Sequence, residues 1–181
     1  GGKMGRTLIS LLETSDHLEL VAAIEQPGAS VIGIDAGLNA GSEESSILIS
    51  DDLALVSGEI DVLIDFTISQ ATVKNLEICA VSGTPVVIAT TGLSVGEEKR
   101  LREIGEAQPI VYSSNYSVGV NAMFRLVAEA AKIFGDGVDI EIVESHHRHK
   151  VDAPSGTAIS LGQFAANALG RELSEVSVHG R

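Results

Sequence analysis

The stretch DVLIDFTISQATVKNLEICAVSGTPVVIATTG, residues 61–92, alternates between two kinds of pattern. Its ends, 61–67 and 85–91, are short apolar runs rich in Val and Ile, which predict strands. Between them, 70–82 has helical spacing and is followed by Gly83, a residue typical of helix ends. The strands are too apolar to have a solvated face, as in parallel sheets covered by helices. The stretch therefore predicts one strand–helix–strand unit of an α/β fold.

The same alternation continues on both sides of this unit. Further strands are predicted at 18–25, 46–50 and 109–115, and helices at 4–14, 94–107 and 117–134. We therefore expect a Rossmann-type, doubly wound parallel sheet over residues 1–116. From 117 to 181 we expect a second, mixed-sheet α+β domain with strands at 138–145 and 175–181 and a helix at 154–170.

Composition narrows the classes of function. Acidic residues outnumber basic ones 25 to 12, and the net charge is −13, so we expect no nucleic-acid or anionic-membrane partner. The sequence has no apolar run of membrane-spanning length and no hydrophobic signal segment. A single cysteine, Cys79, cannot form an internal disulfide and sits at an apolar helical position. These features predict a cytoplasmic protein that acts on a small molecule.

A glycine-rich turn opens the chain. The residues GGKMG precede a predicted helix, and Glu25 lies 20 residues beyond Gly5, at the end of the next predicted strand. This is the spacing between the glycine turn and the ribose-binding acid of dinucleotide-binding folds. In such a turn the backbone approaches a pyrophosphate at the helix N-terminus. The alternative is a tag remnant followed by an unrelated acid at a strand end.

Two later loops lie where such folds bind ligands. ATTG (89–92) and SSNYSVG (113–119) each leave a predicted strand and enter a helix, and we expect them to contact a nicotinamide. The strand that normally precedes the glycine turn is central to the sheet, yet the sequence has no residues before Gly1. We therefore expect the molecule to have a further strand there.

The segment SHHRHK (145–150) concentrates positive charge in an acidic chain. Three readings are open: a zinc site, a cluster that bridges an acidic neighbouring surface, and an anion-binding site. The histidine spacing and two adjacent cations disfavour zinc, and we predict no metal. Four residues after Lys150, PSGTA offers a close backbone approach at Gly156 and a helix start at Thr157. Together these features favour a pocket for a small carboxylate or phosphate.

The motifs EIVESHHRHKVDAPSGTA, GGKMGR, DVLIDFT, ATTG and SSNYSVGVN closely resemble the dihydrodipicolinate reductases, over essentially the whole chain. The resemblance implies reduction of a cyclic imine dicarboxylate, 4-hydroxy-tetrahydrodipicolinate or dihydrodipicolinate, by NADH or NADPH in lysine and diaminopimelate biosynthesis. It also implies a homotetramer. His146 would be the general acid, Lys150 would bind and polarise the substrate, and His147, Gly156 and Thr157 would complete the substrate pocket. The implied cofactor contacts are Gly2, Lys3, Met4, Gly5, Glu25, Gln26, Ala89, Thr90, Thr91, Gly92, Ser113, Ser114, Asn115 and Tyr116.

The chain departs from the family pattern in two ways. It lacks the first glycine of the turn and most of the C-terminal domain, including an expected arginine contact to substrate. Gln26 stands where members that bind the 2′-phosphate often have arginine, so we expect NADH or dual use. Two other functions stay open. A related imine or amino-acid oxidoreductase, such as aspartate dehydrogenase, would leave PSGTA beside HHRHK unexplained, and a silent dinucleotide-binding module would bind cofactor without turnover.

Overall fold

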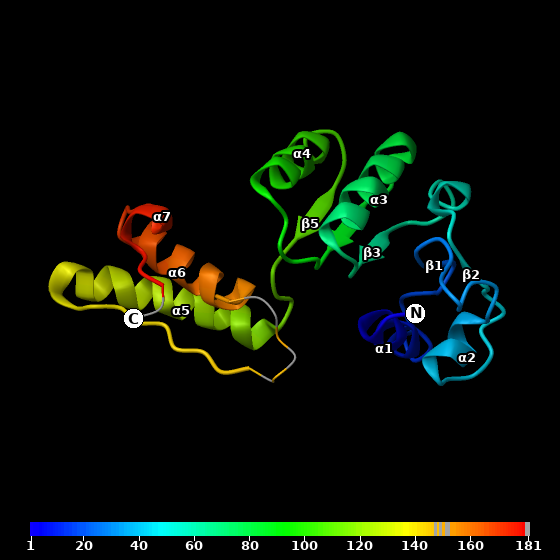
Figure 1. Cartoon of the computed structure of the whole chain (residues 1–181), viewed down its shortest axis with the longest axis horizontal. Helices are drawn as coiled ribbons and strands as arrows, with labels where there is room; N and C mark the ends of the chain where they lie inside the picture. The colour runs from blue at the N-terminus through cyan, green and yellow to red at the C-terminus, as the bar shows by residue number, and fades with distance from the viewer. Residues whose placement is uncertain (147, 149, 151–152, 180–181) are drawn as a thin grey trace. The chain divides into compact units, whose positions relative to one another are not determined.

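The computed structural model describes residues 1–146, 148, 150 and 153–179, and the chain divides into two compact units, Gly1–Tyr112 and Ser113–Arg181. Figure 1 shows strands and helices in the first unit and a pair of long helices in the second. The strands pair in parallel, so the predicted α/β class is confirmed. The division falls between Tyr112 and Ser113, whereas the sequence placed it after residue 116.

A three-stranded parallel sheet forms the larger part of the first unit. β3 (Leu63–Asp65), β4 (Val86–Ile88) and β5 (Ile110–Tyr112) pair in that order. α3 (Ser69–Ser82) and α4 (Val95–Gly105) connect them, and Ser94 and Glu97 form a capping box at the start of α4. The strands and both helices share one apolar core, whose buried members are Leu53, Leu76, Cys79, Val86, Ile88, Leu101 and Ile104.

The remaining two strands form a separate sheet. β1 (Ala23–Ile24) pairs in parallel with β2 (Ile49–Ser50), next to α1 (Lys3–Leu12) and α2 (Ala36–Ala40). One continuous sheet was predicted, but no described strand forms hydrogen bonds to both β1 and β3. The two sheets therefore remain separate ladders. α2, whose N-cap is Asp35, was not predicted.

Two apolar stretches are less buried than their patterns predicted. The strand predicted at 18–25 contracts to Ala23–Ile24, because only these residues have ladder partners, at 49–50. Leu18 is 53% exposed as a result. In α1, Leu11 is 61% exposed and Ile9 is the buried residue.

The second unit is helical in its described part. α5 (Val118–Phe134) packs against α6 (Gly156–Ala168), and the rings of Phe124 and Phe164 stack with centroids 5.1 Å apart. A 3₁₀ turn, η2 (Gly135–Gly137), follows α5, and α7 (Leu173–Val176) follows α6. A second 3₁₀ turn, η1 (Leu53–Leu55), belongs to the first unit.

Both strands predicted in the second unit are wrong for the described residues. The segment 138–145 alternates apolar and acidic residues, but it forms no ladder with any described strand. The segment 175–179 begins inside α7 instead. Gly162 of α6 has no side chain, and Leu173 approaches to 2.9 Å from the position that a Cβ would occupy there, which holds α7 against α6. Gly180 and Arg181 lie outside the described residues.

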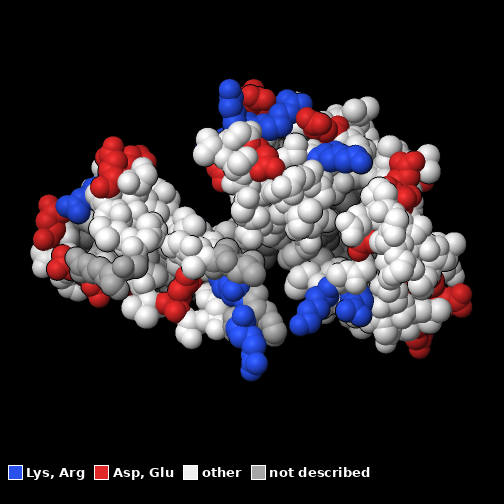
Figure 2. Space-filling view, in the orientation of Figure 1, with Lys and Arg blue, Asp and Glu red and all other residues white. Residues whose placement is uncertain are grey.

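No helix in the described part of the chain combines the length and the apolar character needed to cross a bilayer. Figure 2 shows that basic side chains over α4 lie among acidic ones. Two of these arginines form ion pairs: Arg100 Nε lies 3.2 Å from Glu77 Oε1, and Arg102 Nη2 lies 3.2 Å from Glu98 Oε2. Both pairs are exposed, and such pairs stabilise a fold by less than about 1 kcal/mol.

Candidate functional site

The glycine turn and the acid that follows it in the sequence lie together in the first unit. Glu25 follows β1, and its Oε2 is 2.8 Å from the amino nitrogen of Gly1. Its Oε1 accepts a hydrogen bond from the backbone N–H of Gln26 at 2.8 Å. Glu25 thus lies beside Gly1, the first glycine of the GGKMG turn.

The start of α1 suits a phosphate group. Gly2 is its N-cap and supplies no side-chain hydrogen bond, and the first turn contains no acidic residue. The first N–H groups of a helix lack internal partners and carry partial positive charge, which stabilises an anion. Lys3 lies in the same turn. A Cβ at Gly1 would lie 2.8 Å from Oε2 of Glu25, so the turn passes close to this carboxylate. These residues fit a dinucleotide with its ribose on Glu25.

The loop after β4 contains residues of two kinds. The Thr90 side chain is 3% exposed and points into the protein, where its hydroxyl approaches Asp65. Thr91 and Gly92 are exposed, and Gly92 has φ +77°, a backbone conformation that favours glycine. Of the residues in 89–92 that were predicted to contact the cofactor, Thr91 and Gly92 are therefore accessible to a ligand.

The loop after β5 contacts α6 within the second unit. The hydroxyl oxygens of Ser114 and Ser160 are 2.9 Å apart, and Asn115 Nδ2 donates to Thr157 Oγ1 at 3.4 Å. Ser113 Oγ donates to the carbonyl of Asn115 at 2.8 Å and fixes the turn itself. Residues predicted separately for cofactor and for substrate are thus brought into contact here.

The start of α6 is organised by Ser155, which is 3% exposed. Its Oγ accepts from the N–H of Ala158 at 3.1 Å, as an N-cap does, and its own N–H donates to Glu144 Oε1 at 2.8 Å. Gly156 and Thr157 form the first turn of this helix, as predicted. Glu144 thereby connects the segment before the histidines to the helix start after them.

The predicted general acid lies beside the same carboxylate. His146 Nδ1 is 3.6 Å from Glu144 Oε2, and the two side chains are 39% and 29% exposed. Hydrogen bonds from Ser155 hold the pKa of Glu144 below its ordinary value, and the charges of His146 and Lys150 lower it further. His146, Lys150 and the α6 start therefore belong to one cluster, whereas the predicted His147 lies outside the described residues.

Sequence reasoning missed Glu144 and Ser155. A signal for each was present: an acid two residues before His146, and a serine three residues before Ala158, the N-cap spacing. Within the described residues, no group of three His, Cys, Asp or Glu side chains could hold a metal ion.

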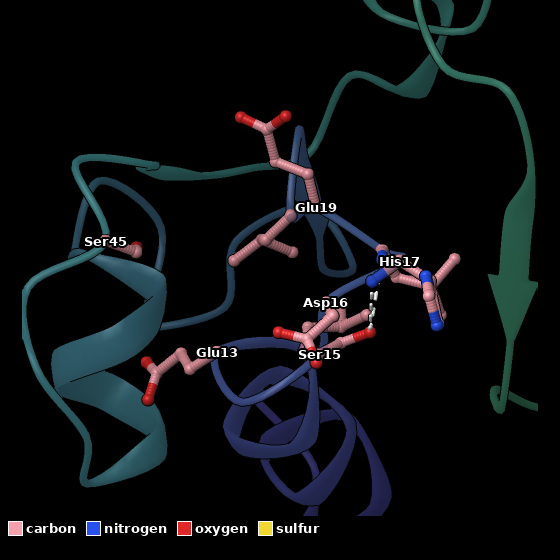
Figure 3. A pocket seen from close by; sticks show the side chains of 9 residues that line it. Glu13, Ser15, Asp16, His17, Glu19 and Ser45 are labelled. Carbon is pink, nitrogen blue, oxygen red and sulfur yellow. Dashed lines mark hydrogen bonds between the residues drawn. The ribbon is translucent and has the colours of Figure 1, made fainter.

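A pocket of about 590 Å³ lies elsewhere in the first unit. Figure 3 shows its polar lining, in which the N–H groups of His17 and Leu18 donate to Ser15 Oγ at 3.2 and 3.1 Å. Its lining begins at Leu12, the last residue of α1, and contains none of the predicted site residues. The glycine turn lies at the opposite end of this helix, so the pocket is not the predicted cofactor site.

Two family models match the chain. Residues 1–116 match the family "Dihydrodipicolinate reductase, N-terminus", and residues 119–180 match "Dihydrodipicolinate reductase, C-terminus". The chain belongs to the dihydrodipicolinate reductase family. The resemblance carried by HHRHKVDAPSGTA and the other motifs is therefore confirmed.

Similar proteins show how much of the family's length is present. Two proteins named 4-hydroxy-tetrahydrodipicolinate reductase, from two strains of Acinetobacter baumannii, are each 49% identical over 181 residues. These matches cover 100% of this chain and 66% of theirs, slightly less than two thirds. The solved structure of a dipicolinate-bound dihydrodipicolinate reductase from Paenisporosarcina sp. TG-14 is also similar. It has a TM-score of 0.71 and 25% identity, over 92% of this chain and 63% of that one.

Proposed function

We propose that the protein is a 4-hydroxy-tetrahydrodipicolinate reductase, which reduces a cyclic imine dicarboxylate with NADH or NADPH in lysine and diaminopimelate biosynthesis. The observation that carries the proposal is the cluster in the second unit. There Glu144 connects His146, 3.6 Å away, to the capped start of α6, which its 2.8 Å hydrogen bond to Ser155 fixes. A proton donor beside an anion-binding helix start suits a substrate that carries carboxylates and must be protonated.

The first unit would hold the cofactor. The turn Gly2–Gly5 would receive the pyrophosphate and Glu25 the ribose hydroxyls, while Thr91 and Gly92 are exposed after β4. Gln26 is exposed and neutral, so it offers no charge to a 2′-phosphate, and we expect NADH to bind at least as well as NADPH. The bound cofactor supplies the hydride.

The second unit would hold the substrate and complete the reaction. One carboxylate would accept hydrogen bonds at Gly156 and Thr157, and Lys150 would neutralise a second one. Hydride addition to the conjugated ring leaves an electron pair on carbon, and His146 would donate the proton that this pair takes up. Glu144 would keep the imidazole oriented. Because a bound dicarboxylate favours imidazolium, substrate would promote protonation of its own acid.

Ternary-complex formation tests this assignment. We expect NADH fluorescence to change further when pyridine-2,6-dicarboxylate, a planar substrate mimic, is added to the binary complex. Lys150→Ala should weaken the binding of pyridine-2,6-dicarboxylate to the NADH complex by about tenfold or more, since it removes a cation opposite a carboxylate. Lys132→Ala, at an exposed lysine paired with Glu129 at 2.9 Å, is the matched control and should bind normally. Absence of a ternary complex with either cofactor would favour the silent module.

The proton donor has its own test. His146→Gln should lower kcat by about 10²- to 10⁴-fold and leave NADH binding nearly intact, because general acid catalysis contributes that much. His179→Gln, at an exposed histidine of the same unit, should keep its kcat. A His146→Gln enzyme with near-normal kcat would reject the role assigned to this residue.

We further propose that the protein is a cytoplasmic homotetramer, as the family resemblance implies. The free thiol of Cys79 is buried, and an unpaired cysteine fits a reducing compartment. Light scattering coupled to gel filtration measures the assembly directly, and a monomer at micromolar concentration would reject the tetramer.

A further inference from the structure

A buried carboxylate lies at the carboxyl end of β3. Asp65 is 2% exposed, and its Oδ1 accepts from the N–H of Thr67 at 2.9 Å and from its hydroxyl at 2.6 Å. The hydroxyls of Thr72 and Thr90 are each 3.2 Å from the same oxygen, and Asn75 Nδ2 donates to Oδ2 at 3.0 Å. All these donors are neutral.

Burying a carboxylate such as that of Asp65 costs free energy unless fixed hydrogen-bond donors surround it. Burying a carboxylate costs several kcal/mol, which hydrogen bonds must offset, so the net gain in stability is small. Its effect reaches the neighbouring core: burial and, after it, the Asp65 charge raise the pKa of Cys79 to about 11. An apolar side chain could fill this position without these demands, so stability alone does not explain Asp65.

The donors come from two adjacent loops and from α3. Thr67 follows β3 and Thr90 follows β4, and the N–H of Thr67 also lies 3.1 Å from Thr90 Oγ1. Thr72 in α3 supports Thr90, since their hydroxyl oxygens are 2.7 Å apart. One carboxylate thus fixes both chain segments at the carboxyl ends of neighbouring parallel strands, where open α/β sheets bind ligands.

Thr90, whose side chain is held by Asp65, directly precedes the exposed residues Thr91 and Gly92. Thr90 points inward to Asp65, and the next residues, Thr91 and Gly92, are exposed. Because the inward side chain of Thr90 is held, the direction in which the following peptide groups face is set. Without the Asp65 carboxylate the peptide groups of 91–92 would no longer be held in one orientation, although every exposed group would still be present.

We propose that Asp65 is a positioning residue for the cofactor. It holds Thr67 and Thr90 so that the exposed groups of 91–92 face the nicotinamide half of the dinucleotide. It touches no cofactor atom itself. The inference rests on the proposed function, because it takes the dinucleotide to be the ligand of this sheet edge.

Asp65→Asn tests the proposal, since asparagine keeps the shape but replaces one acceptor oxygen with a donor amide. We expect the dissociation constant for NADH, measured by fluorescence without substrate, to rise about tenfold. Asp35→Asn is the matched control: Asp35 is 7% exposed, accepts from Leu38 and Ser45, and caps α2. It should lower the melting temperature while changing the dissociation constant less than twofold. Thr72→Val should weaken NADH binding and Thr72→Ser should retain it.

The outcomes separate the two proposals. Wild-type protein that binds neither NADH nor NADPH would overturn the proposed function, and this inference with it, before any variant is compared. If wild-type protein binds NADH and the dissociation constant of Asp65→Asn is within twofold of the wild-type value, the positioning role alone would be overturned. An equal loss of NADH affinity in Asp65→Asn and Asp35→Asn would overturn it as well. If Asp65→Asn fails to fold, as judged by circular dichroism, the comparison of Thr72→Val with Thr72→Ser decides.

Discussion

Asp65 in the first unit and Glu144 in the second are both hydrogen-bonded carboxylates, but their surroundings differ. Asp65 is 2% exposed and accepts from neutral groups of the loop after β3 and of α3. The side chain of Glu144 is 29% exposed and lies beside His146, at 3.6 Å. The Asp65 carboxylate is enclosed by its hydrogen-bond donors. The Glu144 carboxylate accepts from Ser155 at the start of α6 and also lies beside the imidazole of His146.

The difference suits the two tasks of the proposed function. An enclosed carboxylate with fixed donors keeps loops in one arrangement, which suits the binding of a cofactor in one pose. An accessible carboxylate beside histidine can respond to substrate charge and to pH, which suits proton transfer. Substitutions in the two regions should therefore differ in size and in kind.

The largest effect is expected from Thr72→Val in the enclosed network. Valine keeps the shape of this 1% exposed side chain but removes the hydroxyl that lies 3.2 Å from Asp65 and 2.7 Å from Thr90. We expect the free energy of unfolding to fall by about 2 kcal/mol, because a hydrogen bond to a buried charge is lost. Urea denaturation measures it. Thr7→Val, at an exposed hydroxyl of α1, is the control and should change it by less than about 0.5 kcal/mol. Equal values for both would mean that the network contributes nothing.

A smaller effect is expected from Ser155→Ala in the second unit. The substitution removes the cap of α6 and the hydroxyl that lowers the pKa of Glu144. We expect a loss of about 1 kcal/mol, the usual value for an N-cap, in thermal or urea unfolding. Ser155→Thr retains a capping oxygen and should recover most of this loss. If alanine and threonine behave alike, the cap is not a source of stability.

The smallest effect is expected from Glu144→Gln, and it should be present near neutral pH and be lost in acid. Ser155, and then His146 and Lys150, lower the folded-state pKa of Glu144 below 4.5, its ordinary value. A lowered carboxyl pKa gives stability that is present above the unfolded pKa and is lost as pH falls through the folded one. The stability advantage of wild type over Glu144→Gln should therefore be full above about pH 5 and should shrink progressively as pH falls below 4.5. Asp139→Asn, at an exposed acid of the same unit, should show no such loss. A difference that grows in acid would contradict the assigned direction.

Local patterns predicted the elements whose signals lie within a few residues. The helix at 94–107, the end of α3 before Gly83, and Gly156 and Thr157 at the start of α6 follow from neighbouring side chains and backbone. The two wrong strands, at 138–145 and 175–181, had equally clear or suggestive patterns. A strand also needs a partner, and no alternation of residues supplies one.

The α/β class and the family could be read from the residues alone, because apolar periodicity and the HHRHKVDAPSGTA motif are properties of short segments. Only the tertiary structure decided that Asp65 joins Thr90, 25 residues away, and that Glu144 joins Ser155, 11 residues away. Such contacts depend on how strands and helices pack, and a hydrogen bond between distant residues exists only once that packing has brought donor and acceptor within about 3 Å.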